Sequence, residues 1–350
     1  MDTLSLFDTA PPVSGPTASP APSAQAVPAP QAALLPQTVR RQPGPTLLAL
    51  DGNSLAHRAF HAYGRVDESL GAARGGLYGF IALLCAICDK VGADALVVGF
   101  DCRTASVRKA RHPLYKANRV EKDPALYELL DEAPTVLVEL GVPVVVPQGW
   151  EADDVIGSAA RRAEEAGWRC VIATSDKDAF GLISDSTTVL RLRSGLDNAV
   201  EMDPNVLRRE VGVTPEQYLE FAALRGDTSD NLPGISGIGP SRAKALLAAF
   251  GTVAQAVADP IGCRSVLGKS LGQALIDDLA SDDSIFRRNV DLMHIRRDLD
   301  VDLAACRRNA TDDHIAACLV AWELPMLIGR ATGAFGMRPE LAPPPLEAPL

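Results

Sequence analysis

The sequence predicts an α/β fold, a twisted and mostly parallel sheet flanked by helices, followed by a helical C-terminal subdomain. Continuous apolar runs at 47–50 and 95–100 carry no charge, which is typical of strands buried on both faces of a parallel sheet. Amphipathic stretches with helical spacing alternate with such runs up to about residue 193. After residue 201 the strand signals fade and helical signals take over, which predicts a second domain.

The expected elements follow in a regular order along the chain. Strands are expected at 47–50, 95–100, 142–146, 170–174 and 187–192, with helices between them at 77–91, 124–140 and 153–167. Further helices are expected at 204–211, 215–224, 241–250 and 252–258. We therefore divide the chain into a tether (1–45), an α/β domain (46–201), a helical subdomain (202–333) and a tail (334–350). The tether is rich in Pro and Ala without periodicity, so we expect it to be disordered.

Composition sets broad limits on the class of protein. The chain has 350 residues, 47% of them hydrophobic, which is enough for a sizeable core. A net charge of -10 argues by itself against a nucleic-acid partner, but a local concentration of acids accounts for most of it. The seven cysteines are odd in number and scattered, which indicates reduced thiols in a cytoplasmic protein. No apolar run is long enough to cross a membrane, and we expect a monomer.

Nine carboxylates stand where apolar runs stop, where helices begin, or ahead of a glycine-rich turn. They are Asp51, Asp101, Glu151, Asp153, Asp154, Asp176, Asp178, Asp227 and Asp230. Side chains that follow parallel strands gather at the carboxyl edge of the sheet, where open α/β folds bind ligands. For one cluster alone, a helix start or a turn explains the acids equally well. All the clusters together favour a two-metal site, since like charges that close require hard cations such as Mg²⁺ or Mn²⁺.

A glycine-rich turn follows the last two acids. Gly237, Ile238 and Gly239 precede a Pro at a helix start, with Ser241 and Lys244 just beyond. Glycines let a backbone approach a phosphate closely, and free N–H groups at a helix start bind anions. A plain tight turn between helices is the alternative. The acids directly upstream favour a turn that holds a DNA backbone beside the metal site.

The segment 103–122 is strongly basic. Seven cations stand against one acid, Glu121; the cations are Arg103, Arg108, Lys109, Arg111, Lys116, Arg119 and Lys122, and Tyr115 lies among them. A solvated surface helix would also carry such charges. The position directly after Asp101 instead indicates a clamp that holds a nucleic-acid strand over the metals.

These residues lie in motifs that resemble the 5' nuclease family, which includes the bacterial 5'-3' exonucleases, the N-terminal domain of DNA polymerase I and, more distantly, flap endonucleases. The likeness runs over about 46–329, in LALDGNSLAHRAFHA, VVGFD, YKANR, GWEADD, TSDKD and GDTSDNLPGISGIGPSRA. It implies a PIN-like sheet and a helix-three-turn-helix motif that binds duplex backbone with a potassium ion. No polymerase region follows in the sequence, so we expect a stand-alone nuclease.

The resemblance also implies a role for each matching residue. One metal would be held by Asp51, Asp101, Glu151 and Asp153. The other would be held by Asp153, Asp176, Asp178 and Asp230, and water molecules would link the metals to Asp154 and Asp227. Arg108, Lys116 and Arg119 would act catalytically from a helical arch, and His57, Arg58, Lys109, Arg111 and Tyr115 would contact DNA. The family often carries a base-stacking Tyr where this chain has His57.

We therefore expect a metal-dependent 5'-3' exonuclease or flap endonuclease that acts on DNA with 5' ends, flaps or nicks, and on RNA primers, at the nucleoid. An RNase of the PIN class would lack the glycine turn. A catalytically inactive DNA-structure binder would have lost acids, and none of the nine is lost. Near the N-terminus, Leu4, Leu6 and Phe7 resemble a sliding-clamp binding motif on the flexible tether.

Overall fold

The computed structural model describes residues 44–63, 72–193 and 195–337. The tether up to residue 43, with Leu4, Leu6 and Phe7, and the tail from residue 338 lie outside these ranges, so the expectations for them stay predictions. No helix in the described ranges is long and apolar enough to span a membrane.

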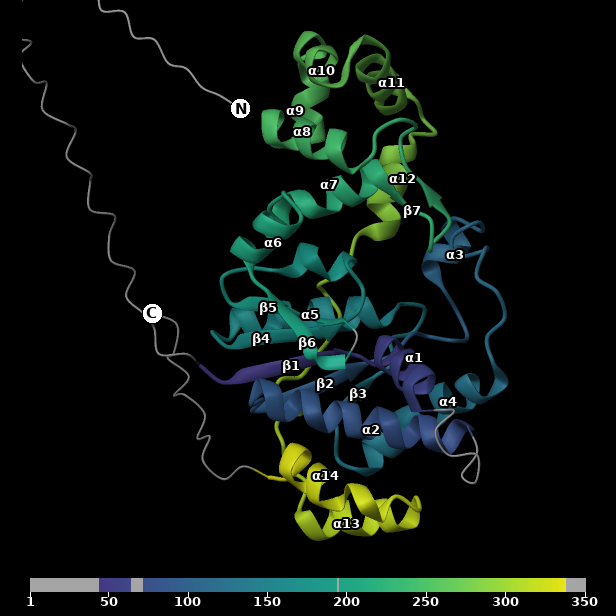
Figure 1. The fold of residues 1–350 in the computed structure, drawn as a ribbon, viewed down its shortest axis with the longest axis vertical. Coiled ribbons are helices and arrows are strands. Elements are labelled where there is room, and N and C mark those ends of the chain that lie inside the picture. Colours follow the sequence, from purple (N-terminus) through teal and green to yellow (C-terminus); the bar gives the residue numbers. More distant parts are fainter. Residues whose placement is uncertain (1–43, 64–71, 194, 338–350) are drawn as a thin grey trace, which may run out of the picture. The chain divides into compact units, whose positions relative to one another are not determined.

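A six-stranded sheet forms the centre of the α/β domain (Figure 1). Its strands are β1 (Thr46–Asp51), β2 (Ala95–Gly99), β3 (Val144–Val145), β4 (Arg169–Thr174), β5 (Thr187–Arg193) and β6 (Gly195–Met202). Their order is β3-β2-β1-β4-β5-β6, and all neighbours are parallel except β5 and β6. From β1 the chain proceeds outward to β2 and β3 and then crosses back to β4 on the other side of β1, so the strand order reverses there. A reversal of this kind opens a crevice at the carboxyl ends of the strands.

Successive residues of the central strand face opposite sides of the sheet, as the two-residue period of a strand requires. Leu48 and Leu50 share a core with the helices α1 (Gly52–Tyr63), α2 (Ala72–Val91) and α4 (Pro124–Glu139). Leu47 and Ala49 share the other core with α5 (Ala152–Glu165) and the 3-10 helix η1 (Asp178–Leu182). Both faces of β1 are therefore buried, and only its carboxyl end is free to present a side chain to a ligand.

The second region is mostly helical, as expected from the sequence. Its elements are α6 (Pro204–Glu210), α7 (Pro215–Arg225), β7 (Gly226–Asp227), β8 (Leu232–Pro233), α8 (Pro240–Phe250), α9 (Val253–Ala258), α10 (Pro260–Leu267), α11 (Lys269–Ala280) and α12 (Ile285–Met293). Side chains cap several of these helices: Asp203 accepts from the Val206 N–H at 2.7 Å, and a Pro occupies the first turn of α6.

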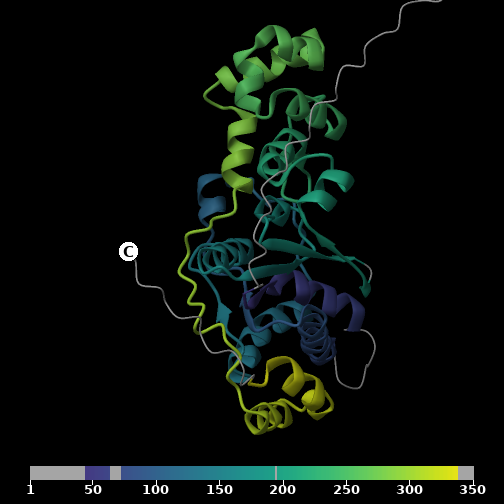
Figure 2. The same cartoon turned by 90° about the vertical axis from the view of Figure 1, so that its left-hand side faces the viewer.

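After α12 the chain contacts the α/β domain, which the sequence did not predict, while the domain bounds at 202–333 stay a prediction. Leu299 N donates to Ser158 Oγ at 3.0 Å, and Leu96 N donates to Cys306 O at 2.9 Å. The helices α13 (Asp312–Ala321), η2 (Pro325–Leu327) and α14 (Ile328–Phe335) follow, and α14 packs on α2. Figure 2 shows this returning segment in yellow-green, between α12 and the yellow helices. The sequence analysis named no separate helices beyond residue 258, and helical spacing does not tell which surface an apolar stripe covers.

The basic segment contains little helix. One short helix, α3 (Val107–Arg111), is followed by turns and irregular chain up to Asp123, so the helical arch expected here is not formed as a helix in this structure. His112, Pro113 and the positive φ of Lys116 (56°) interrupt the helical pattern.

Candidate active site

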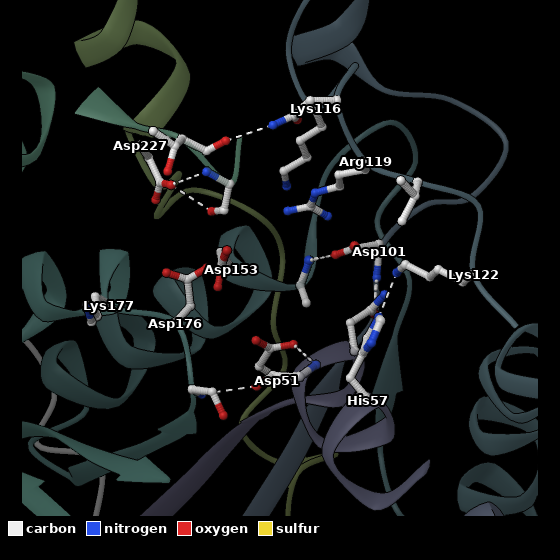
Figure 3. Close-up of a pocket in the computed structure, with 18 of the residues that line it drawn as sticks. Asp51, His57, Asp101, Lys116, Arg119, Lys122, Asp153, Asp176, Lys177 and Asp227 are labelled. Carbon is white, nitrogen blue, oxygen red and sulfur yellow. Dashed lines mark hydrogen bonds between the residues drawn. The ribbon is translucent and has the colours of Figure 1, made fainter. Parts of the chain in front are cut away.

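A cleft of about 960 Å³ opens at the carboxyl ends of β1, β2 and β4 (Figure 3). The α/β domain contributes Asp51, Asp101, Asp153 and Asp176, and the β7–β8 loop contributes Asp227. The basic segment faces these acids with Lys116, Arg119 and Lys122. Acids from five separate stretches of sequence therefore share one cleft, as their positions after strands and at helix starts predicted.

Asp51 ends β1 and is held only by neutral donors. Its Oδ1 accepts from Ser54 N at 2.9 Å, and its Oδ2 accepts from Thr174 Oγ1 at 2.8 Å. Burial, together with the nearby charges of Asp101 and Asp176, raises the pKa of Asp51 to about 7, against the effect of the two hydrogen bonds. The carboxyl group is thus placed where its negative charge is poorly compensated by the protein.

Asp153 lies in the first turn of α5, and its carboxylate has fewer hydrogen-bond partners than that of Asp51. Its Oδ1 is buried without a hydrogen-bond partner. Burial raises the pKa of Asp153 well above its usual value, and the charges of Asp176 and Asp51 act in the same direction. A buried carboxylate oxygen without a partner costs free energy unless a ligand satisfies it.

The turn after β4 carries Asp176, which lines the cleft, and Asp178, which lies just behind it. Asp178 N donates to Asp176 Oδ1 at 2.9 Å, and Asp176 N donates to Thr174 Oγ1 at 3.0 Å. Enclosure by the protein raises the pKa of both carboxyl groups, that of Asp178 to about 8, and the nearby Asp227 raises them further. Asp227 itself accepts from Ser229 N at 2.8 Å and from Ser229 Oγ at 2.6 Å.

The chemistry of these donors fits a hard divalent cation. The set consists of oxygen ligands, and Asp153 presents an unsatisfied buried oxygen to it. Within 44–63, 72–193 and 195–337, no three acid, His or Cys side chains are close enough together to hold an ion as they stand. The carboxylates therefore share a cleft without forming a closed ligand cage, and their assignment to individual metals stays a prediction.

On the opposite wall, two cations of the basic segment are paired with Glu151 and Asp230. Lys116 Nζ lies 3.1 Å from Glu151 Oε1 and 3.8 Å from Asp230 Oδ2, while Arg119 donates to Asp230 Oδ1 at 2.7 Å. Tyr115, which is buried, donates its hydroxyl to Glu151 Oε2 at 3.1 Å. Burial lowers the pKa of Lys116, but Glu151 and Asp230 outweigh that effect, so the net shift is upward. Lys116 is thus held as a cation over the cleft.

Main-chain contacts fix this wall to the β7–β8 loop. Lys116 N donates to Asp230 O at 2.9 Å, and Asn118 Nδ2 donates to Thr228 O at 2.8 Å. In the reverse direction, Asn231 Nδ2 donates to Leu114 O at 2.8 Å. The basic segment is therefore tied to the stretch that carries Asp227 and Asp230.

Arg108 and Asp154 lie away from the cleft, in contrast to the roles that the resemblance implied for them. Both are buried, and the guanidinium donates to both carboxylate oxygens, at 2.7 and 2.8 Å. Asp154 also accepts from Glu151 N at 3.0 Å and from Arg296 N at 2.9 Å. Arg108 further donates to the carbonyls of Leu292 and His294, each at 2.9 Å. This saturated pair joins α3, α5 and the returning chain.

His57 comes from α1 and contacts Lys122 rather than an acid. Lys122 Nζ lies 2.6 Å from His57 Nε2. Burial lowers the pKa of His57 to about 4, and the neighbouring cation Lys122 contributes to that shift, so the ring is neutral at neutral pH. Sequence reasoning included Lys122 in the basic clamp but gave it no individual role in the site. It also missed Arg225, which lines the cleft from the end of α7.

The remaining residues expected to contact DNA are spread more widely. Arg58 donates to Ser175 Oγ at 3.2 Å and to Leu192 O at 2.8 Å, beside the cleft. Arg111 is exposed and lies 3.4 Å from Asp291 Oδ1. Lys109 is exposed, and neither it nor Arg111 lines the cleft.

The glycine turn has the backbone that its sequence predicted. Gly237 has a φ of +80°, and Arg242 closes the turn by donating to Gly237 O at 2.7 Å. Ile238 is buried and anchors the turn, while Gly239 precedes the first residue of α8. Ser241 is exposed on that helix, and Lys244 is partly buried near Gly212. Upstream, two glycines allow a close crossing: a Cβ on Gly226 would lie 2.2 Å from Gly234 N.

The fold and the cleft define an α/β protein with an acidic site at the strand-order reversal and a helical domain attached beside it. Two family models match in succession: "5'-3' exonuclease, N-terminal resolvase-like domain" over residues 46–212, and "5'-3' exonuclease, C-terminal SAM fold" over residues 213–314. The chain belongs to this 5'-3' exonuclease family, which confirms the resemblance drawn from its motifs.

Relatives among curated proteins are DNA polymerases I. The enzyme of Mycobacterium tuberculosis is 39% identical over 260 residues, which is 73% of this chain and 28% of the relative. The thermostable enzyme of Thermus aquaticus is 33% identical over 275 residues, which is 77% of this chain and 31% of the relative. The chain thus spans less than a third of the length of these relatives.

Solved structures share the fold. T5 5'-exonuclease with bound zinc ions superposes with a TM-score of 0.59 at 21% identity, covering 82% of this chain and 99% of that one. The catalytic core of Rad2 in complex with DNA substrate superposes with a TM-score of 0.53 at 18% identity, covering 84% of this chain and 92% of that one. These matches confirm the sheet with its attached helical domain.

Proposed function

We propose that this protein is a divalent-metal-dependent 5'-3' exonuclease and flap endonuclease that hydrolyses phosphodiester bonds at the 5' ends of DNA. One observation carries the proposal: poorly compensated carboxylates, Asp51 and Asp153, face the cations Lys116 and Arg119 across one cleft. Such a cleft can bind metal ions on one wall and a phosphate on the other. The family, the zinc-bound T5 exonuclease and the DNA-bound Rad2 core support the same chemistry.

Asp51, Asp101, Asp153 and Asp176 are the residues best placed to hold Mg²⁺ or Mn²⁺, with Glu151, Asp178, Asp227 and Asp230 beside them. Bound divalent ions would supply Lewis acidity and neutralise phosphate charge. Asp154 is left out of this set, because Arg108 and two backbone N–H groups already satisfy it.

Besides pairing with acids, Lys116 and Arg119 would neutralise the charge of the reacting phosphate. Each is now paired with an acid, Glu151 or Asp230, whose charge a metal ion would take over. A released cation can then donate to the phosphate in the transition state, where charge stabilisation is worth most. The glycine turn at 237–239 would hold the duplex backbone through N–H groups, with a potassium ion completing that contact.

A digestion series tests the proposal. Flap, nicked, gapped and blunt DNA, and the same flap with an RNA 5' segment, are incubated in Mg²⁺, Mn²⁺, Ca²⁺ or EDTA. We expect cleavage of the 5' strand in Mg²⁺ and Mn²⁺, binding without cleavage in Ca²⁺, and tighter duplex binding in K⁺ than in Na⁺. Binding of every substrate with no cleavage in any metal would instead identify an inactive DNA-structure binder, and cleavage of RNA alone would identify an RNase.

A further inference from the structure

The cations of the cleft differ in their partners. Lys116 is paired with Glu151, and Arg119 is paired with Asp230. Lys122 lines the same cleft, yet within the described ranges it has no carboxylate at ion-pair distance, and its hydrogen bond is to the uncharged ring of His57. Of the three cations that the basic segment brings to the cleft, Lys122 is therefore the one with no carboxylate of the described ranges at ion-pair distance.

The contact with His57 has a defined polarity. An ammonium group donates hydrogen bonds and accepts none, so His57 Nε2 must be the acceptor of the 2.6 Å bond and the ring proton must be on Nδ1. This bond uses one of the ammonium donors and leaves the others for a ligand. His57 belongs to α1 and Lys122 to the end of the basic segment, so the bond also joins two elements at the cleft wall (Figure 3).

The surroundings of Lys122 favour an anion from outside the protein. Partial burial lowers the pKa of Lys122, and the neighbouring charges of Arg119 and Lys116 lower it further, although Asp101 acts in the opposite direction. A partly desolvated cation beside like charges is unfavourable by itself and becomes favourable when an anion arrives. The ammonium group of Lys122 is therefore positioned to bind an anionic ligand.

We propose that Lys122, held in place by His57, forms an anion subsite that receives a phosphate of the DNA strand being cut. This proposal rests on the proposed function, because it takes the ligand to be a nucleic-acid strand. His57 is then a positioning residue that orients the ammonium group, and it does not act as a platform for a base. The phosphate is either the terminal 5'-phosphate or one inside the strand.

Two substitutions of His57 separate this role from base stacking. His57→Gln keeps a hydrogen-bond acceptor for Lys122 but removes the ring, whereas His57→Phe keeps the ring and removes the acceptor. A positioning role predicts that Gln preserves function and Phe does not. A stacking role predicts the reverse, since a base stacks on an aromatic ring and not on an amide of this kind.

The experiment measures binding of a labelled flap DNA in Ca²⁺ at several salt concentrations, and single-turnover cleavage in Mg²⁺. We expect Lys122→Ala to weaken binding about 5- to 10-fold and to reduce the salt slope by about one phosphate contact. His57→Phe should match Lys122→Ala, and His57→Gln should match the wild type. Lys90→Ala removes the same charge from an exposed site at the end of α2 and should change nothing. Flaps with a 5'-phosphate or a 5'-hydroxyl distinguish the two phosphates, since only a terminal subsite loses affinity for the hydroxyl form.

The pKa of His57 provides a test of the subsite that does not depend on catalysis. Removing the Lys122 charge should raise the pKa of His57, measured by NMR of the imidazole in EDTA, because that cation helps to lower it. An unchanged His57 pKa or an unchanged salt slope in Lys122→Ala would overturn the subsite. Wild-type behaviour of His57→Phe with loss in His57→Gln would establish stacking instead. If the wild type cut no DNA at all, the proposed function would fail, while the salt slope and the His57 pKa would still report on the subsite.

Discussion

Asp153 and Asp154 are neighbours in the first turn of α5, yet the structure gives them opposite environments. Asp153 lines the cleft with a buried oxygen that has no partner, and its pKa is raised well above the usual value. Asp154 is fully buried, and Arg108 and two backbone N–H groups satisfy it. Successive helix positions point about 100° apart, so one faces the cleft and the other faces the returning chain.

The difference in partners divides the acids into two groups. The first group has unsatisfied carboxylates that can bind a ligand, and the second has paired carboxylates that stabilise the fold. Asp51 and Asp153 belong to the first group, since no cation of the described chain is paired with them. Asp154 belongs to the second, and its buried pair with Arg108 connects segments distant in sequence. Acids of both groups carry the same charge in the sequence, so only their partners reveal which group an acid belongs to.

The largest expected effect is the loss of cleavage when an acid of the first group is neutralised. Asp153→Asn should lower the single-turnover cleavage rate by at least about 10³-fold, because a single group that stabilises transition-state charge is worth about 10²- to 10³-fold and a metal ligand more. Stability should not fall, since the substitution removes an uncompensated buried charge. Thermal unfolding in EDTA and flap binding in Ca²⁺ are the controls. Cleavage close to the wild-type rate would exclude Asp153 from the metal site.

The second group should respond in the opposite way, through stability. Asp154→Ala removes the bidentate carboxylate partner of the buried Arg108 guanidinium and leaves it only Glu151 at 3.3 Å and two carbonyls, so we expect the free energy of unfolding to fall by about 3 kcal/mol in urea denaturation in EDTA. Arg108→Met combined with Asp154→Leu should recover part of that loss, because replacing a whole buried pair by apolar side chains is often nearly neutral. A stable Asp154→Ala protein with weakened Mg²⁺ binding would show that Asp154 serves the metal after all.

A smaller effect appears in the pH dependence of stability. The folded pKa of Asp51, about 7, lies above the unfolded value of about 3.9, so the folded protein binds this proton more tightly than the unfolded chain. The resulting stabilisation is complete below about pH 4 and is lost as the pH rises through 7, by at most about 1.4 kcal/mol per pH unit for one group. Saturating Mg²⁺ should reduce this loss. In EDTA, Asp51→Asn should have a shallower decline than the wild type, and parallel curves would contradict the raised pKa.

The sequence was sufficient to predict the sheet and the gathering of the acids. Apolar runs ending at Asp51 and just before Asp101 indicated parallel strands, and the shared carboxyl edge of those strands placed the two side chains together. The glycine turn at 237–239 was equally predictable, because a positive φ at Gly237 is rare for other residues. These features depend on residue type and local spacing, which the sequence contains.

Contacts between distant segments could not be predicted in this way. The pairing of Arg108 with Asp154 depends on where the chain returns after α12, and the hydrogen bond between Lys122 and His57 depends on how the basic segment meets α1. The same reason explains why the packing of α14 on α2 was not predicted. An apolar stripe on a helix does not tell which partner it covers.

The crossing of Gly226 and Gly234 has a mechanical consequence. A Cβ on Gly234 would lie 2.2 Å from Arg225 O, so the two strands of the β7–β8 hairpin touch without side chains between them. This hairpin carries Asp227 at one end of a short stretch and leads to the glycine turn at 237–239 at the other. Under the proposed function, a duplex bound at the turn would have its phosphates at a set distance from the acids. The cutting position would then be determined by the duplex junction, and flap length would leave it unchanged.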